Sequence, residues 1–114
     1  KSIRKNKLMA QKKKQYKLPP YILIGGMEFK IISKEIEDFG VMDFDARVIC
    51  IRKSLSAEEK LDTLMHEVHH AALGVSGLSN VLNDDNLEEA LVRLVEHMVV
   101  PIIKEEHKKF IKKR

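Results

Sequence analysis

The sequence predicts an α+β fold in which a small antiparallel sheet is followed by two helices. Three observations support this prediction. Apolar and polar residues alternate in short runs between residues 28 and 52, which is typical of half-buried strands. Apolar residues then recur at helical spacing between residues 61 and 72, and a second apolar stripe follows from residue 87. At 114 residues the chain is long enough for one small hydrophobic core.

The sheet is expected from three runs. Residues 28–33 form the first convincing strand, shortly after Gly25 and Gly26, which interrupt regular structure. Residues 41–45 alternate after a turn at Phe39-Gly40, and residues 47–51 are rich in β-branched side chains. Because two of these runs are separated by a short connection, we expect antiparallel pairing.

The first helix has clear start and stop signals. Ser56 and Glu59 have the spacing of a capping box, in which each side chain satisfies the backbone N–H of the other. Gly74 is the expected left-handed end of this helix, and a polar loop should follow. The second helix is expected to start near Asn86, and Pro101 should kink or interrupt it.

Charge divides the chain into three parts. Residues 1–18 carry eight basic residues and no acidic residue, and residues 104–114 carry six basic and two acidic residues. The part between them, residues 19–103, has seven basic and fifteen acidic residues, a net charge of −8. We therefore expect a basic N-terminal segment, an acidic folded domain and a basic C-terminal tail. The basic ends are expected to be solvated or to bind nucleic acid or an acidic protein surface, and residues 2–16 could form a marginal basic helix.

Several classes of protein are disfavoured by the composition. The longest apolar candidate, residues 98–103, is far shorter than the roughly 20 residues of a membrane helix. Cys50 is the single cysteine, which rules out an intrachain disulfide and suits a reducing compartment. The basic N-terminus has no apolar stretch of the kind that a signal peptide needs. We therefore expect a cytoplasmic protein that does not enter a membrane.

The first helix contains the motif His-Glu-x-x-His. His66 and His70 are four residues apart, so their imidazoles lie on one helix face and can bind one metal ion. Zinc suits nitrogen ligands in a tetrahedral shell with one position open for catalysis. Glu67 follows the first histidine, where it can take a proton from water activated by the metal. The motif predicts a catalytic Zn²⁺ site.

A third protein ligand is expected from the second helix. Glu89 is the preferred candidate, because apolar residues surround it at helical spacing, and Glu88 is the alternative. His69 is expected beside the site or at the surface, although it could replace His70 in a distorted site. His97 and His107 belong to no motif and are expected to be ordinary surface or partly buried residues, while Cys50 is expected to fill space in the core.

These features resemble the ImmA/IrrE-like metallopeptidases, small phage-type gluzincins with an HExxH motif. The resemblance covers about residues 28–101. It is carried by residues 39–45, 47–51, 55–56, 63–71 and 87–90. It implies a zincin-like fold, with His66, His70 and Glu89 as metal ligands and Glu67 as general base. It also implies zinc-dependent hydrolysis of an intracellular peptide or protein, in the cytoplasm of the host cell if the chain is phage-encoded, or in association with the virion.

A second function belongs to another class. Both tyrosines, Tyr16 and Tyr21, precede the predicted strands, so the sequence offers no evident group to stabilise the oxyanion of peptide hydrolysis. The alternative is a zinc-stabilised structural or adaptor protein of a phage or mobile element, with weak or no catalysis. Its basic ends would bind a partner or nucleic acid.

Overall fold

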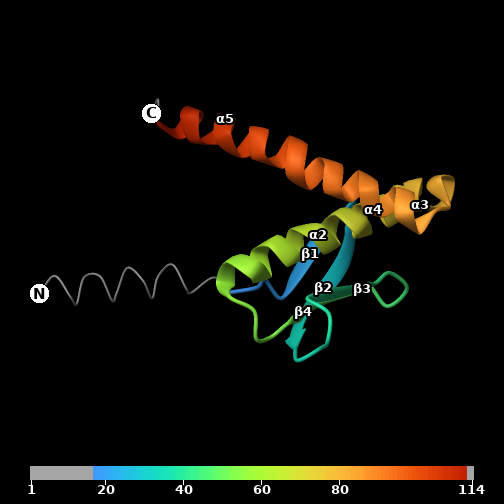
Figure 1. Cartoon of the computed structure of the whole chain (residues 1–114). Coiled ribbons are helices and arrows are strands. Elements are labelled where there is room, and N and C mark those ends of the chain that lie inside the picture. The colour runs from blue at the N-terminus through green and yellow to red at the C-terminus, as the bar shows by residue number, and fades with distance from the viewer. Residues whose placement is uncertain (1–16, 113–114) are drawn as a thin grey trace, which may run out of the picture.

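The computed structural model describes residues 17–112, in which four strands precede a series of helices (Figure 1). The strands are β1 (Tyr21–Ile24), β2 (Met27–Lys34), β3 (Gly40–Asp43) and β4 (Val48–Arg52). The helices are α2 (Ala57–Val75), α3 (Leu78–Leu82), α4 (Asp85–Leu94), the π-helix η1 (Val95–Val99) and α5 (Val100–Lys112). The predicted α+β class is confirmed. The basic helix expected within residues 2–16 lies outside the described residues.

The sheet is mixed, which corrects the expectation of a wholly antiparallel sheet. Its strand order is β1-β2-β4-β3. The β1–β2 and β3–β4 pairs are antiparallel, but the central pair, β2 and β4, is parallel. The chain leaves β2, forms the outer strand β3 and returns through β4, which lies between the two. Alternation of side chains identifies strands but does not reveal which strand becomes the neighbour of another.

Strand β1 was not expected from the sequence. It pairs with β2 through a tight turn at Gly25 and Gly26, whose φ angles are +57° and +82°. Two consecutive residues with positive φ are what the common two-residue hairpin requires, and glycine adopts this conformation without steric cost. The two glycines therefore signalled a β-hairpin and not only an interruption of regular structure.

Helix α2 covers one face of the sheet and forms the core with it. The capping box at its start is present, with Ser56 accepting from the Glu59 N–H and Glu59 accepting from the Ser56 N–H. The core consists of side chains buried between this helix and the strands: Ile24, Phe29, Ile31, Ile49, Ile51, Leu64 and Ala71. Full burial of one large aliphatic or aromatic side chain contributes about 1.5–3 kcal/mol, so this contact fixes the position of α2 on the sheet.

Gly74 does not end helix α2, contrary to expectation. The helix continues to Val75, and the left-handed residue is Gly77, with a φ of +81°. A Cβ atom at Gly74 would lie 2.6 Å from the ring of Phe44. Gly74 therefore allows the turn between β3 and β4 to pack closely against the helix.

The helix that starts at Asp85 is interrupted before Pro101, as predicted, but it remains helical. Asp84 caps α4 by accepting from the backbone N–H groups of residues 86 and 87. The interruption takes the form of η1, in which the Val100 N–H donates to the Val95 carbonyl. Proline has no N–H for the α-helical bond to residue 97, and the wider π-helical turn accommodates this loss.

Helix α5 extends away from the sheet, past the far side of α2 (Figure 1). Every residue from 101 to 111 is exposed to solvent. Among residues 17–112, every helix lacks the length or the apolar character that crossing a membrane would require.

Candidate metal centre

Helix α2 brings His66 and His70 to the side that faces α4, whereas Glu67 packs against β3 of the sheet. Thr63, Leu64, Glu67 and Ala71 are the buried residues of α2. Because this spacing matches the helical repeat, the buried stripe anchors the helix on the sheet. The two histidines, one residue before and three residues after Glu67, lie beside this stripe and are only partly buried. The fold therefore presents both imidazoles at the edge of the core.

Helix α4 brings Glu89 to the same place. Val92 is 1% exposed and holds α4 in position, and Glu89 lies nearly one helical turn before it. The Glu89 carboxylate reaches both histidines: its Oε1 lies 3.2 Å from His66 Nε2 and its Oε2 lies 2.9 Å from His70 Nε2. The two Nε2 atoms are 3.3 Å apart.

These three distances fit a small tetrahedral cation. Zinc bonds of about 2.0–2.1 Å at tetrahedral angles place neighbouring ligand atoms about 3.3 Å apart. One ligand atom from each of His66, His70 and Glu89 lies within 4.8 Å of the other two, which is the one such group found among the described residues. Two imidazoles and one carboxylate are also the donor set of a catalytic zinc site with one open position.

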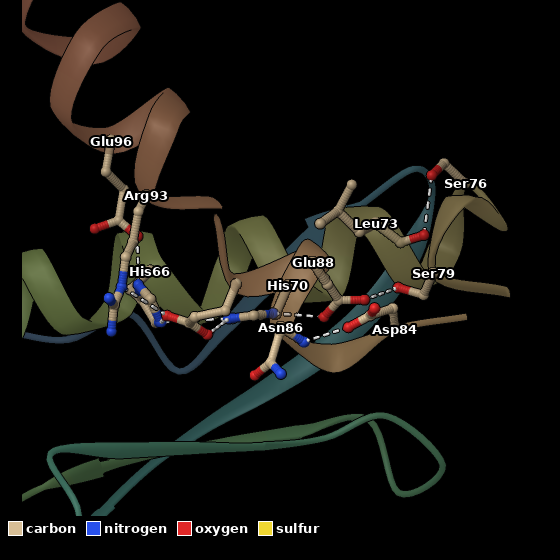
Figure 2. A network of polar contacts seen from close by, with 11 residues as sticks. His66, His70, Leu73, Ser76, Ser79, Asp84, Asn86, Glu88, Arg93 and Glu96 are labelled. Atoms are coloured by element: carbon tan, nitrogen blue, oxygen red, sulfur yellow. Dashed lines mark hydrogen bonds and ion pairs between the residues drawn. The ribbon is translucent and has the colours of Figure 1, made fainter. Parts of the chain in front are cut away.

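Each histidine is also contacted by a carboxylate at its other ring nitrogen (Figure 2). Glu96, from η1, contacts His66 Nδ1, and Glu88 Oε2 lies 2.6 Å from His70 Nδ1. A carboxylate at Nδ1 favours the tautomer that carries its proton there, which leaves the Nε2 lone pair free to bind a metal. Glu88, the alternative third ligand, thus contacts the far nitrogen of His70, whereas Glu89 contacts the nitrogens that face each other.

The contact between Glu88 and His70 shifts the pKa values of both side chains. A hydrogen bond from the Ser79 hydroxyl lowers the pKa of Glu88, and its contact with His70 lowers it further. Burial acts to lower the pKa of His70, but the hydrogen bond with Glu88 and the charges of nearby carboxylates outweigh burial and raise it. Glu88 is therefore more readily ionised, and His70 more readily protonated, than the same groups would be in water.

Glu96 and Ser79 were not identified from the sequence. Glu96 lies seven residues after Glu89, which is two turns along one helix face, so helical spacing was a signal for it. Ser79 belongs to α3, in a segment expected to be a loop, and only the fold places it beside Glu88.

Glu67 is 9% exposed and lies beside a hollow of about 430 Å³ that His66 also lines. Gly40, at the start of β3, is so close that a Cβ atom there would lie 3.2 Å from Glu67 Cγ. Burial raises the pKa of the Glu67 carboxyl, although the charges of His66 and His70 oppose this effect. A carboxyl with a raised pKa holds a proton more readily and suits general acid–base chemistry.

Arg93 contacts the same carboxylate that joins the two histidines. Arg93 lies one helical turn after Glu89, and its Nε is 3.5 Å from Glu89 Oε1 (Figure 2). The Arg93 side chain is largely exposed. An exposed pair of this kind contributes little to stability.

The other candidate residues lie outside the three-ligand group. His69 faces the contact between α2 and α4, where its Nδ1 is buried without a hydrogen-bond partner among the described residues. His97 and His107 are exposed. Cys50 is buried in β4, in agreement with a packing role.

Comparisons of this chain with protein-family models, with curated proteins and with solved structures give no match. The resemblance to ImmA/IrrE-like metallopeptidases therefore stays a prediction from the motif.

Proposed function

We propose that this chain is a zinc-dependent peptide hydrolase that acts on an intracellular protein. The observation that carries the proposal is the convergence of His66 Nε2, His70 Nε2 and one Glu89 carboxylate at spacings of 2.9–3.3 Å. A buried glutamate, Glu67, lies next to this group. The HExxH motif predicted His66, Glu67 and His70, and Glu89 was the preferred third ligand predicted from the second helix.

The residues divide the chemistry between them. His66, His70 and Glu89 would hold zinc, which as a Lewis acid makes water a stronger nucleophile near neutral pH and polarises the scissile carbonyl. Glu96 and Glu88 keep the two imidazoles oriented through their Nδ1 atoms. Glu67 takes the proton from the attacking water and delivers it to the leaving nitrogen, for which its raised pKa is suited.

Strand β3 offers a place for an extended peptide. It is an edge strand of the sheet, and its first residue, Gly40, packs against Glu67. The Phe39 carbonyl accepts from the Arg52 N–H, which fixes the alternation of the ladder with β4. Backbone groups of Gly40 and Met42 consequently point away from β4, where an added peptide strand could pair with them.

The test is the variant Glu67→Gln in the zinc-loaded protein. Cleavage of a library of fluorescence-quenched peptides should be lost, while zinc content measured by atomic absorption stays at one ion per chain. Glu58→Gln, a glutamate in the exposed first turn of the same helix, is the matched control and should cleave normally. Normal cleavage by Glu67→Gln would refute the proposal.

The alternative function, a zinc-stabilised adaptor with basic ends, is favoured by α5. This helix exposes apolar residues such as Ile102 and Ile103 together with lysines. Tyr21 lies in β1, at the opposite edge of the sheet from β3, so it cannot serve the site as an oxyanion donor. Bound zinc with no cleavage of any peptide, together with salt-dependent binding of DNA, would favour the adaptor.

A further inference from the structure

The hollow beside Glu67 is acidic on several sides. Its lining residues come from the segment before β3, from the start of β3, from α2 and from η1, and they are Asp38, Phe39, Gly40, Asp62, Thr63, His66, Glu67 and Glu96. Four of these eight residues are carboxylates, and neither lysine nor arginine is among them. The Glu67 side chain is nine-tenths buried, its carboxylate forms no hydrogen bond among the described residues, and it lines this hollow.

The acidic groups are arranged for an elongated cation rather than for a second metal ion. Apart from the group at the metal centre, the described residues include no set of three His, Cys, Asp or Glu side chains with ligand atoms within 4.8 Å of one another. The carboxylates of Asp38 and Asp62 instead belong to different walls, one from the β2–β3 loop and one from α2. A volume of about 430 Å³ is enough for a long side chain.

The hollow also has a surface for an apolar stem. Phe39 is 50% exposed at the wall formed by the β2–β3 loop, and Gly40 leaves the adjoining wall without a side chain. Lysine and arginine lay their methylene groups along such surfaces and keep the charge near carboxylates, and an aromatic ring adds a favourable contact with the cation.

The position of β3 connects the hollow to the proposed substrate path. A peptide paired with this edge strand alternates its side chains between the two faces of the sheet. Every second side chain would point toward α2, and Gly40 lies both in β3 and in the lining of the hollow. One such side chain would therefore enter the hollow beside Glu67.

We infer that this hollow is a specificity subsite that binds a lysine or arginine side chain of the substrate, next to the bond that is cut. The inference rests on the proposed peptidase function. Lys104, which lines a neighbouring hollow together with Asp62, forms no ion pair with Asp62 among the described residues, so the Asp62 carboxylate stays available for a substrate cation.

The test compares peptides that differ at one position. A peptide cleaved from the quenched library is resynthesised with lysine, norleucine or glutamate at each position flanking the scissile bond, and kcat/KM is measured for each. Lysine should be preferred over norleucine by about tenfold at one of these positions, because each carboxylate of a partly exposed pair contributes up to about fivefold. Asp62→Asn and Asp38→Asn should each reduce this preference, whereas Asp45→Asn, an exposed residue outside the hollow, should not.

The outcomes separate this inference from the proposed function. Cleavage without preference for lysine, or a preference that Asp62→Asn and Asp38→Asn leave intact, overturns the subsite but keeps the peptidase. If no peptide is cleaved, the peptidase proposal fails, and fluorescence anisotropy then decides the subsite with labelled oligolysine and oligo-norleucine peptides. Tighter binding of the lysine peptide that depends on Asp62 supports the subsite, and equal binding overturns it.

Discussion

The C-terminal helical region contains two halves with similar sequence patterns and different surroundings. From Asp85 to Val99 it faces α2: Val92 is 1% exposed, and its glutamates contact His66 and His70. From residue 101 to residue 111 every residue is exposed, although apolar residues recur at helical spacing there as well. An apolar stripe thus makes a helix able to pack, but the neighbouring element decides whether it does.

The largest effect is expected at Glu89, which joins the first half of this region to both histidines. Glu89→Ala removes a proposed zinc ligand, so zinc affinity should fall by more than the 10–100-fold typical for residues that only orient a ligand. Competition with a chromophoric chelator measures this change. Glu88→Ala is the matched control and should lose less, because Glu88 contacts only the Nδ1 atom of His70. A greater loss for Glu88→Ala would make Glu88 the third ligand.

A variant at Glu96 tests whether η1, like α4, contributes to zinc binding. Glu96→Gln keeps the size of the side chain but removes the charge at His66 Nδ1, and zinc affinity should fall by about 10–100-fold. The same chelator competition applies. Glu105→Gln, in the exposed second half, should leave the affinity unchanged. Equal affinities of the two variants would show that Glu96 does not orient His66.

Matched truncations in the two halves test the difference in packing directly. Val92→Ala should lower the free energy of unfolding by about 1–3 kcal/mol, because it leaves a cavity against α2. Ile103→Ala should change it by no more than about 0.5 kcal/mol, since this side chain is 61% exposed. Urea denaturation followed by circular dichroism measures both. A large loss for Ile103→Ala would mean that α5 is packed in solution.

The smallest effect is the loss of folding stability that the buried, ionised Glu67 carboxylate causes. Because burial raises the pKa of Glu67, the native protein holds this proton more tightly than the unfolded chain does. Its stability therefore falls as the pH rises from the ordinary value of 4.5 through the raised native pKa. In the metal-free protein, Glu67→Gln should stabilise the fold by about 0.5–2 kcal/mol above this window and by less below it.

Urea denaturation in the presence of a chelator, at pH values on both sides of the window, measures this difference. A gain that does not depend on pH would show that the charge of Glu67 is not its cause. The control for the charge change is Glu58→Gln, because Glu58 is exposed and the substitution removes the same charge. Glu59 is unsuitable because it is part of the capping box.

Much of the site was predictable because its residues are close together in the chain. The capping box placed the start of α2, and the spacing of His66 and His70 placed both imidazoles on one face of that helix. The choice between Glu88 and Glu89 could not be made in this way. Adjacent residues on a helix point about 100° apart, and only the rotation of α4 against α2 determines which one faces the histidines.

The sheet shows the same limit. Local alternation identified β2, β3 and β4, but the parallel pairing of β2 with β4 depends on where the β3–β4 hairpin folds back. Gly74 was assigned to a helix end because glycine is common there. Its actual role, the close approach of Phe44, exists only once the turn after β3 packs on α2.

The sequence by itself determined helices α2 and α4, strands β2, β3 and β4 and the two-histidine motif, because these depend on interactions between residues a few positions apart. The tertiary structure decided the order of the strands, the meeting of Glu89 and Glu96 with the histidines, and the hollow beside Glu67. Each of these results requires elements that are distant in the chain to pack at a particular angle, and side-chain periodicity carries no information about that angle.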